Sequence, residues 1–123
     1  MRQAFAFLPL ALLLLAGCSE KPLQNQNVQF YNSSMQTQAI HFEILGADGT
    51  PAFAKNITVE PLKPDQPTPT ISIPHLEIGD YRLRASAGRE STSVDEHLDR
   101  SISAIIVNIL AGGNLDISVQ RGD

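Results

Sequence analysis

Along most of the chain, apolar and polar residues alternate with a period of two, which is the spacing of half-buried β-strands. This alternation predicts strands at residues 28–31, 38–45, 56–62, 70–74, 81–86 and 115–120. Residues 102–110 are apolar on both faces, as is typical of a central strand. Residues 90–101 are mostly polar and predict a short strand followed by a loop or a single helical turn.

Turn-forming residues separate these segments and indicate how the strands are connected. Gly and Asp at 46–49, and Gly and Asn at 112–114, predict tight connections. The proline-rich stretch predicts a loop or a frayed edge, because proline has no N–H for a sheet ladder; its prolines are Pro61, Pro64, Pro67 and Pro69. About seven short strands without a convincing amphipathic helix predict an all-β fold, an antiparallel β-sandwich.

One strand carries a family resemblance. Ile78, Gly79, Tyr81 and Leu83 follow the order apolar, Gly, x, Tyr, x, apolar. This resembles the strand entry of immunoglobulin-like and transthyretin-like extracellular domains. The resemblance implies an immunoglobulin-like sandwich, although the Cys…Trp…Cys pattern of antibody domains is absent.

The first residues form a different pattern. Arg2 supplies a positive charge, and residues 4–15 form an apolar run broken only by Pro9, which is the layout of a secretory signal. The run is shorter than the roughly 20 apolar residues that a transmembrane helix needs. It ends in Leu15-Ala16-Gly17-Cys18, which resembles the lipobox of bacterial lipoproteins.

The lipobox resemblance implies where the protein resides. Cleavage is expected between Gly17 and Cys18, and the Cys18 sulfur is expected to carry a diacylglycerol, with three acyl chains such as palmitate in total. Several chains give a durable anchor, whereas one gives a reversible anchor. Ser19 stands where Asp retains such proteins in the inner membrane, so we expect the outer membrane, with the domain on the periplasmic side. The alternative is a core cysteine after an ordinary signal.

These features divide the chain into three parts. We expect a signal peptide at 1–17, a polar lipidated tether at 18–27 and one β-sandwich domain at 28–121, with the last residues from Arg121 onward trailing off exposed. With Cys18 used for lipid, no thiol is left for a disulfide, and stability must come from packing.

The charge balance excludes one class of partner. Nine Lys and Arg residues stand against 13 Asp and Glu, and Arg2 leaves with the signal, so the mature chain carries a net charge near −5. No basic stripe is present to displace counterions from phosphates, which argues against nucleic acid. There is no Trp and aromatic residues are only 6% of the chain, so few side chains are available on which bases or sugars could stack.

The sequence gives no sign of a metal, cofactor or catalytic site. His41, His75 and His97 match no ligand spacing, and the acidic stretch Asp95-Glu96-x-x-Asp99 lacks the calcium-loop pattern. No serine lies in Gly-x-Ser-x-Gly, and no glycine-rich phosphate loop opens a helix. We therefore expect no enzyme and no cofactor.

Arg82, Arg84 and Arg89 form the one basic cluster, which is expected on the outward face of a strand. An anionic ligand, or lipopolysaccharide phosphate, is one interpretation of these residues. The alternative is that they pair with acidic residues across the sheet.

Taken together, the sequence predicts a membrane-anchored lipoprotein of the bacterial envelope that acts as a non-enzymatic binding or scaffold module. A protein partner is expected at open sheet edges or at the proline-rich loop. The alternatives are a small-ligand or glycan-binding domain, a hydrolase with a loop-built site, and a surface adhesin.

Overall fold

The computed structural model describes residues 26–74 and 76–122, which form eight β-strands and no helix. The strands are β1 Gln26–Asn32, β2 Gln38–Leu45, β3 Pro51–Val59, β4 Thr70–Ile73, β5 Gly79–Ala87, β6 Glu90–Leu98, β7 Ile102–Ile109 and β8 Leu115–Arg121. The all-β prediction is confirmed. The eight strands include every predicted one; the polar segment at 90–98, for which the sequence predicts a short strand followed by a loop or a helical turn, forms a full strand, β6, along β5.

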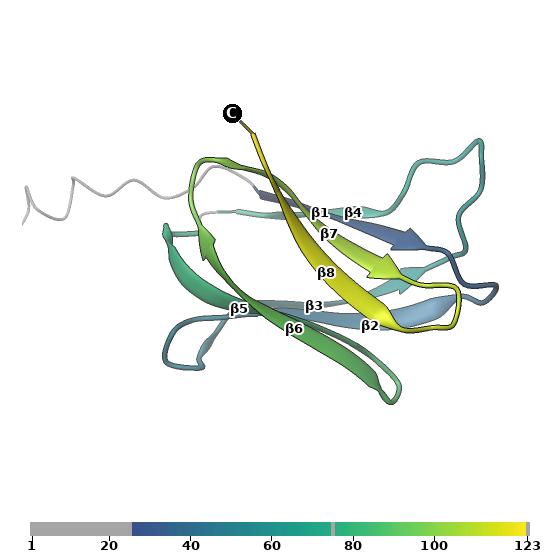
Figure 1. Ribbon diagram of the computed structural model, residues 1–123, viewed down its shortest axis with the longest axis horizontal. Coiled ribbons are helices and arrows are strands. Elements are labelled where there is room, and N and C mark those ends of the chain that lie inside the picture. The colour runs from purple at the N-terminus through teal and green to yellow at the C-terminus, as the bar shows by residue number, and fades with distance from the viewer. Residues whose placement is uncertain (1–25, 75, 123) are drawn as a thin grey trace, which may run out of the picture.

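The strands form two four-stranded sheets that pack face to face as a β-sandwich (Figure 1). Their orders are β4-β1-β7-β8 and β3-β2-β5-β6. All neighbours are antiparallel except β1 and β7, which run parallel from Val28 opposite Ile105 to Asn32 opposite Ile109. The prediction of purely antiparallel sheets is therefore wrong for this one pair.

Strand boundaries differ from the predicted ones where pairing extends a strand beyond its alternating residues. β3 begins at Pro51 instead of residue 56, because β2 offers it a partner as far as Leu45. β1 begins at Gln26, inside the expected tether, because Gln26 lies opposite Ile73 of β4.

The core lies between the two sheets and contains the inward residues of the predicted alternation. Phe30 of β1 and Phe42 of β2 meet across it edge to face, with ring centroids 6.1 Å apart. In β7, Ile105 and Val107 face the core, and Ile106 on the outer face is also buried, as expected for a strand between two others.

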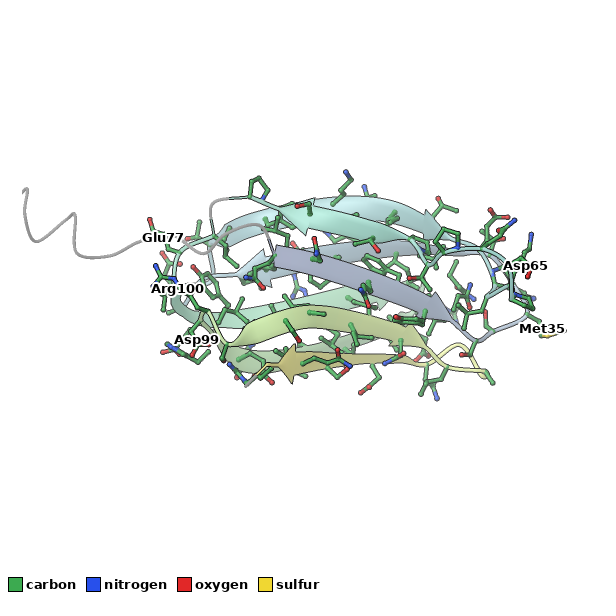
Figure 2. All side chains as sticks on the ribbon, turned by 90° about the horizontal axis from the view of Figure 1, so that it is seen from above. Met35, Asp65, Glu77, Asp99 and Arg100 are labelled. Carbon is green, nitrogen blue, oxygen red and sulfur yellow. The ribbon has the colours of Figure 1, made fainter. Side chains whose placement is uncertain are left out.

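The sandwich has two chemically different ends (Figure 2). At the end where β1 begins, which we call the base, the connections carry Glu77, Asp99 and Arg100. At the opposite end, the tip, lie Met35 and Asp65. The tip contains the connections at 33–37, 60–69, 88–89 and 110–114, and the predicted proline-rich loop is one of them. Gly113, with φ of 92°, makes the β7–β8 turn possible.

Candidate functional site

Two of the three predicted arginines lie on the outer face of β5, each opposite an acidic residue. The register places Arg82 beside Asp95 of β6 and Arg84 beside Glu43 of β2. Nε of Arg82 donates to Oδ1 of Asp95 at 2.8 Å, and Nε of Arg84 donates to Oε1 of Glu43 at 2.9 Å. Both side chains therefore form the cross-strand pairs that were the alternative to an anion site.

These pairs change the titration of the carboxyl groups. The hydrogen bond from Arg82 holds the pKa of Asp95 below its usual range. The hydrogen bond from Arg84 does the same for the pKa of Glu43, against an opposing effect of burial. Opposite charges on this face are thus matched pair by pair.

Arg89 is not close to the other two arginines. It lies in the turn that follows Gly88, beyond the last β5–β6 pair, Ala87 opposite Glu90. An extended strand places it roughly 20 Å from Arg82. The described residues therefore contain no compact basic cluster formed by these three side chains.

An open pocket of about 480 Å³ lies at the base, between the β2–β3 connection and the paired ends of β5 and β6. Its charged lining includes Asp80, Arg82, Asp95 and His97. Nδ1 of His97 lies 2.8 Å from Oδ1 of Asp80, and Arg82 donates a hydrogen bond to Asp95. The pocket is within the size range of small-molecule sites, and its charged groups are already paired with each other.

The histidines do not meet. His41 lies opposite Ser86 near the end of β5, whereas His97 lies opposite Asp80 near its start. His75 lies outside the described residues. Within residues 26–74 and 76–122, no three His, Cys, Asp or Glu side chains gather as a metal site would require.

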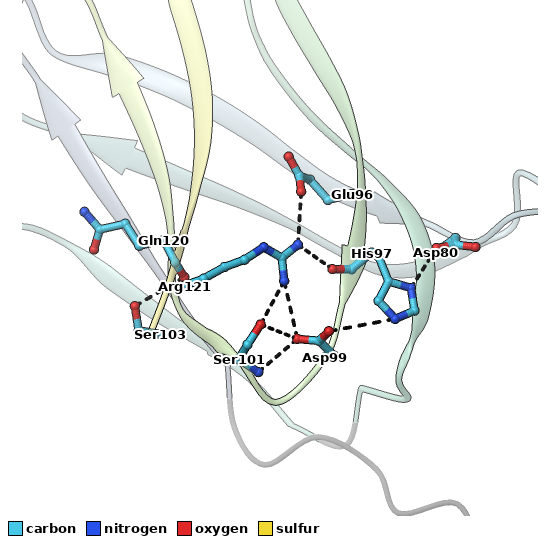
Figure 3. Close-up of polar contacts among 8 residues, drawn as sticks. All are labelled: Asp80, Glu96, His97, Asp99, Ser101, Ser103, Gln120 and Arg121. Carbon is cyan, nitrogen blue, oxygen red and sulfur yellow. Dashed lines mark hydrogen bonds and ion pairs between the residues drawn. The ribbon is translucent and has the colours of Figure 1, made fainter. Parts of the chain in front are cut away.

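Arg121 joins the two sheets at the base (Figure 3). The sequence predicts a trailing exposed end from this residue; Arg121 is exposed, but it belongs to β8 and its side chain is held by several contacts. Nη2 of Arg121 donates to the His97 carbonyl oxygen at 2.7 Å and lies 3.3 Å from Oε1 of Glu96. Nη1 donates to Oγ of Ser101 at 3.0 Å and lies 3.3 Å from Oδ1 of Asp99. The guanidinium therefore connects β8 to β6 and to the β6–β7 connection.

The acidic residues at 95–99 contact two different arginines, Arg82 and Arg121. Asp95 pairs with Arg82 on the outer face, whereas Glu96 and Asp99 contact Arg121 at the side of the sandwich. Hydrogen bonds from the hydroxyl and the N–H of Ser101 are the main reason that the pKa of Asp99 is lowered. The three carboxylates do not converge on one point.

At the tip, Asn32 holds three connections together. Its side chain is fully buried, and Nδ2 donates to the carbonyl oxygens of Gln36 at 2.8 Å and Val59 at 2.9 Å. Oδ1 accepts from the N–H and the hydroxyl of Ser34. The Asn32 carbonyl accepts from the N–H of Leu62 at 2.9 Å. Every polar group of this side chain is used, as burial requires.

The large apolar side chains that the described residues leave exposed all lie in these tip connections. Met35 is 92% exposed, Leu62 46% and Leu110 45%. Their connections are joined through β1, because Ser33 donates to the carbonyl of Ile109 at 2.7 Å, next to the bond between Asn32 and Leu62. We call these three side chains the tip patch.

Sequence reasoning missed both Asn32 and the tip patch. In the sequence, Asn32-Ser33-Ser34 indicates only a turn, because an asparagine after a strand is typical of a turn. The partner that explains its burial, Val59, is remote in the sequence. A single Met or Leu in a loop gives no signal of its own, since scattered apolar surface residues are common.

The lipidation and cleavage residues, Gly17 and Cys18, lie outside the described residues, as does the rest of the segment at 1–25. The part of the chain that the structure describes holds no helix that is long and apolar enough to cross a membrane.

Comparison with known proteins gives little further information. No protein-family model matches the chain, and no curated protein matches it. Among solved structures, it is similar to that of a "putative cell adhesion protein" from Bacteroides ovatus, with a TM-score of 0.44 and 13% identity. The match covers 81% of this chain and 44% of that one, so this chain spans less than half of that protein's length.

Proposed function

We propose that the protein is a lipid-anchored, non-enzymatic binding module of the bacterial envelope, held at the periplasmic face of the outer membrane. The anchor is Cys18, at the end of the apolar run at 4–15. One observation carries the binding role: β1 begins at the charged base, and the exposed apolar side chains lie at the opposite end. A domain anchored through its N-terminal side presents this end away from the membrane.

The described strand order supports a finer fold class. In the immunoglobulin constant-type order, the first and second strands share a sheet. Here β1 lies between β4 and β7, and β2 lies in the other sheet. Of the two classes that the Tyr81 strand resembles, we therefore propose the transthyretin-like one.

Three of the four edge strands, β4, β3 and β6, are poor contact surfaces. β4 is a short edge strand with Pro69 before it and Pro74 after it, and prolines block the pairing of an added strand. On β3, Lys55 lies opposite the buried Phe42 and so places a charge on the inward face. On β6, the backbone carbonyl of His97 already accepts a hydrogen bond from Arg121, so it cannot pair freely with an added strand. These features favour the loops over these three edges as the binding surface.

The proposal is tested by chemical crosslinking in isolated envelopes. We expect the wild-type chain in the outer-membrane fraction, joined to at least one envelope protein, and both findings are expected to be lost with Cys18→Ala. Recovery of no crosslinked protein above that control would count against the binding role. Digestion of whole cells with an external protease separates the periplasmic protein from a surface adhesin, because only the adhesin is cleaved.

A second candidate function is small-ligand binding in the pocket at the base. The presence of Asp80, Asp95 and His97 in the lining of this pocket of about 480 Å³ favours it. A polar ligand with both an acidic and a basic group would compete with the pairs already formed there. Thermal shift of the wild type against Asp95→Asn, over a panel of such compounds, tests this; equal shifts in both chains would exclude the pocket.

A further inference from the structure

We infer that the tip patch is the contact surface of the module, and that it binds an apolar, uncharged cleft on another protein of the envelope. This deepens the proposed function and rests on it. The patch consists of Met35, Leu62 and Leu110, one from each of three connections at the tip.

The patch is a fixed feature of the fold because the backbone under it is hydrogen-bonded. Leu62 donates its N–H to the carbonyl of Asn32, and Ser33 donates to Ile109, the neighbour of Leu110. The buried Asn32 amide adds bonds to Gln36 and Val59. These contacts give Met35, Leu62 and Leu110 a common platform before any partner binds, which lowers the entropy cost of association.

The charges around the patch indicate the chemistry of its partner. The connections at 33–37 and 110–114 contain no charged residue. The connection at 60–69 carries Glu60, Lys63 and Asp65, with a net charge of −1, and the β5–β6 turn at the same end carries Arg89, so charges of both signs surround the patch. A partner surface rich in one charge would gain nothing here, whereas an apolar cleft would remove the patch from water. Met35 is well suited to such a cleft because its long, unbranched side chain adapts to irregular cavities.

A stable dimer of the chain through this surface does not fit its size. From their exposed fractions, the three side chains offer on the order of 300 Å² of apolar surface. A stable interface needs roughly 800 Å² from each partner. A contact of this size suits a weak, reversible complex, and anchoring both proteins in one envelope raises their effective concentration.

The anchoring membrane does not fit either. The nine-residue strands of the sandwich are about 30 Å long. The segment from Cys18 to residue 25 spans at most about 28 Å when fully extended. Because β1 begins at the base, a segment of this length favours an orientation with the tip away from the membrane that holds the chain.

Photocrosslinking in living cells tests the inference on the full chain. A benzoylphenylalanine is placed at Met35, Leu62 or Leu110, with Glu77 and Arg100 at the base as matched control positions. We expect all three tip positions to give an adduct with the same protein, and mass spectrometry to map its attachment to apolar side chains. The base positions are expected to give none of this adduct.

A second set of variants tests the apolar character. In the chain with the probe at position 35, Leu62→Ser together with Leu110→Ser is expected to lower the adduct yield about tenfold, because two apolar contacts are lost. Gln120→Ser, on the outer face of β8, is the control and is expected to leave the yield unchanged. Melting temperatures of both chains show that each is folded.

Several results would overturn the inference. These are an adduct with phospholipid, a dimer of this chain, attachment through charged side chains, no adduct at the tip, or an unchanged yield in the double serine variant. Protein adducts from the base positions alone would leave the proposed binding role standing and place its surface elsewhere. Absence of adducts from both ends would count against the binding role as well.

Discussion

Asn32 is the residue on which the tip most depends. It ends β1, is fully buried, and links Gln36, Ser34 and Val59 through its amide. The structure needs an amide at this position, since Nδ2 meets two carbonyl oxygens and Oδ1 meets two donors. No other side chain of this size offers both kinds of group.

Replacing this amide is expected to be costly. Asn32→Ala leaves buried carbonyl and N–H groups without partners, and we expect a loss of about 3 kcal/mol of unfolding free energy. Asn32→Asp is expected to be at least as harmful at neutral pH, because a carboxylate would face two carbonyl oxygens. Urea denaturation measures both variants, with the exposed Asn27→Ala as control. An Asn32→Ala chain as stable as this control would contradict the role given to Asn32.

Glu43 makes the acid stability of the domain testable at a single residue. The hydrogen bond from Arg84 lowers the folded-state pKa of Glu43, so the carboxylate contributes stability that is present above the unfolded value and lost as the pH falls through the lower, folded value. We expect unfolding free energy to decrease below about pH 4.3, the ordinary glutamate value. Asp95 and Asp99, whose pKa values are also lowered, extend the decrease further into acid.

Glu43→Gln is the matched variant for this effect. It removes the titrating group, and the decrease in unfolding free energy with falling pH is expected to be shallower than in the wild type. Melting temperatures between pH 2.5 and 7 check this, at low salt to limit screening. Identical pH profiles for the two chains would contradict the assignment to the Arg84 pair.

At the scale of the strands, polar and charged residues protect the edges of both sheets. Lys55 is the clearest case, because it lies on the inward face of the edge strand β3 between Phe53 and Ile57. An added strand would bury its charge, which opposes edge-to-edge association.

Lys55→Val is expected to remove this protection. It makes the inward face of β3 continuously apolar, and we expect concentration-dependent self-association in light scattering. Lys55→Glu keeps a charge at the same place and is expected to remain monomeric. Equal scattering from both variants over the same concentration range would show that Lys55 has no such role.

The sequence predicted those strands whose alternation reflects burial directly. β2 and β8 are examples, because Ile40, Phe42 and Ile117 face the core and polar residues face out. It predicted β6 poorly, since the inward face of this edge strand holds only two apolar residues, Val94 and Leu98, and its length is set by pairing with β5. The parallel pair β1–β7 depends on contacts between remote segments, which local patterns do not encode.

For the candidate sites too, the sequence predicted what local alternation determines and missed what depends on contacts between remote segments. The positions of Arg82 and Arg84 on the outer face followed from alternation, but the acid that each would contact depended on the register between strands. Arg121 was missed because its partners, Glu96 and Asp99, come from another sheet and another connection. Side-chain contacts across the sandwich require the fold, and local sequence does not supply them.

At the scale of the whole molecule, the domain has a base, where β1 begins, and a tip that carries its large exposed apolar side chains together with charges of both signs. The Arg121 contacts close the side of the sandwich near the base, and Asn32 organises the tip. This polarity has a functional meaning only if the chain is held at its N-terminal side. The lipid on Cys18 is therefore the central claim.

Mass spectrometry of the mature chain from envelopes tests that claim most directly. We expect an N-terminus at Cys18 with a mass increase equal to a diacylglyceryl group and a further acyl chain. An unmodified thiol at this residue, or an N-terminus at another position, would contradict both the anchor and the orientation inferred from it.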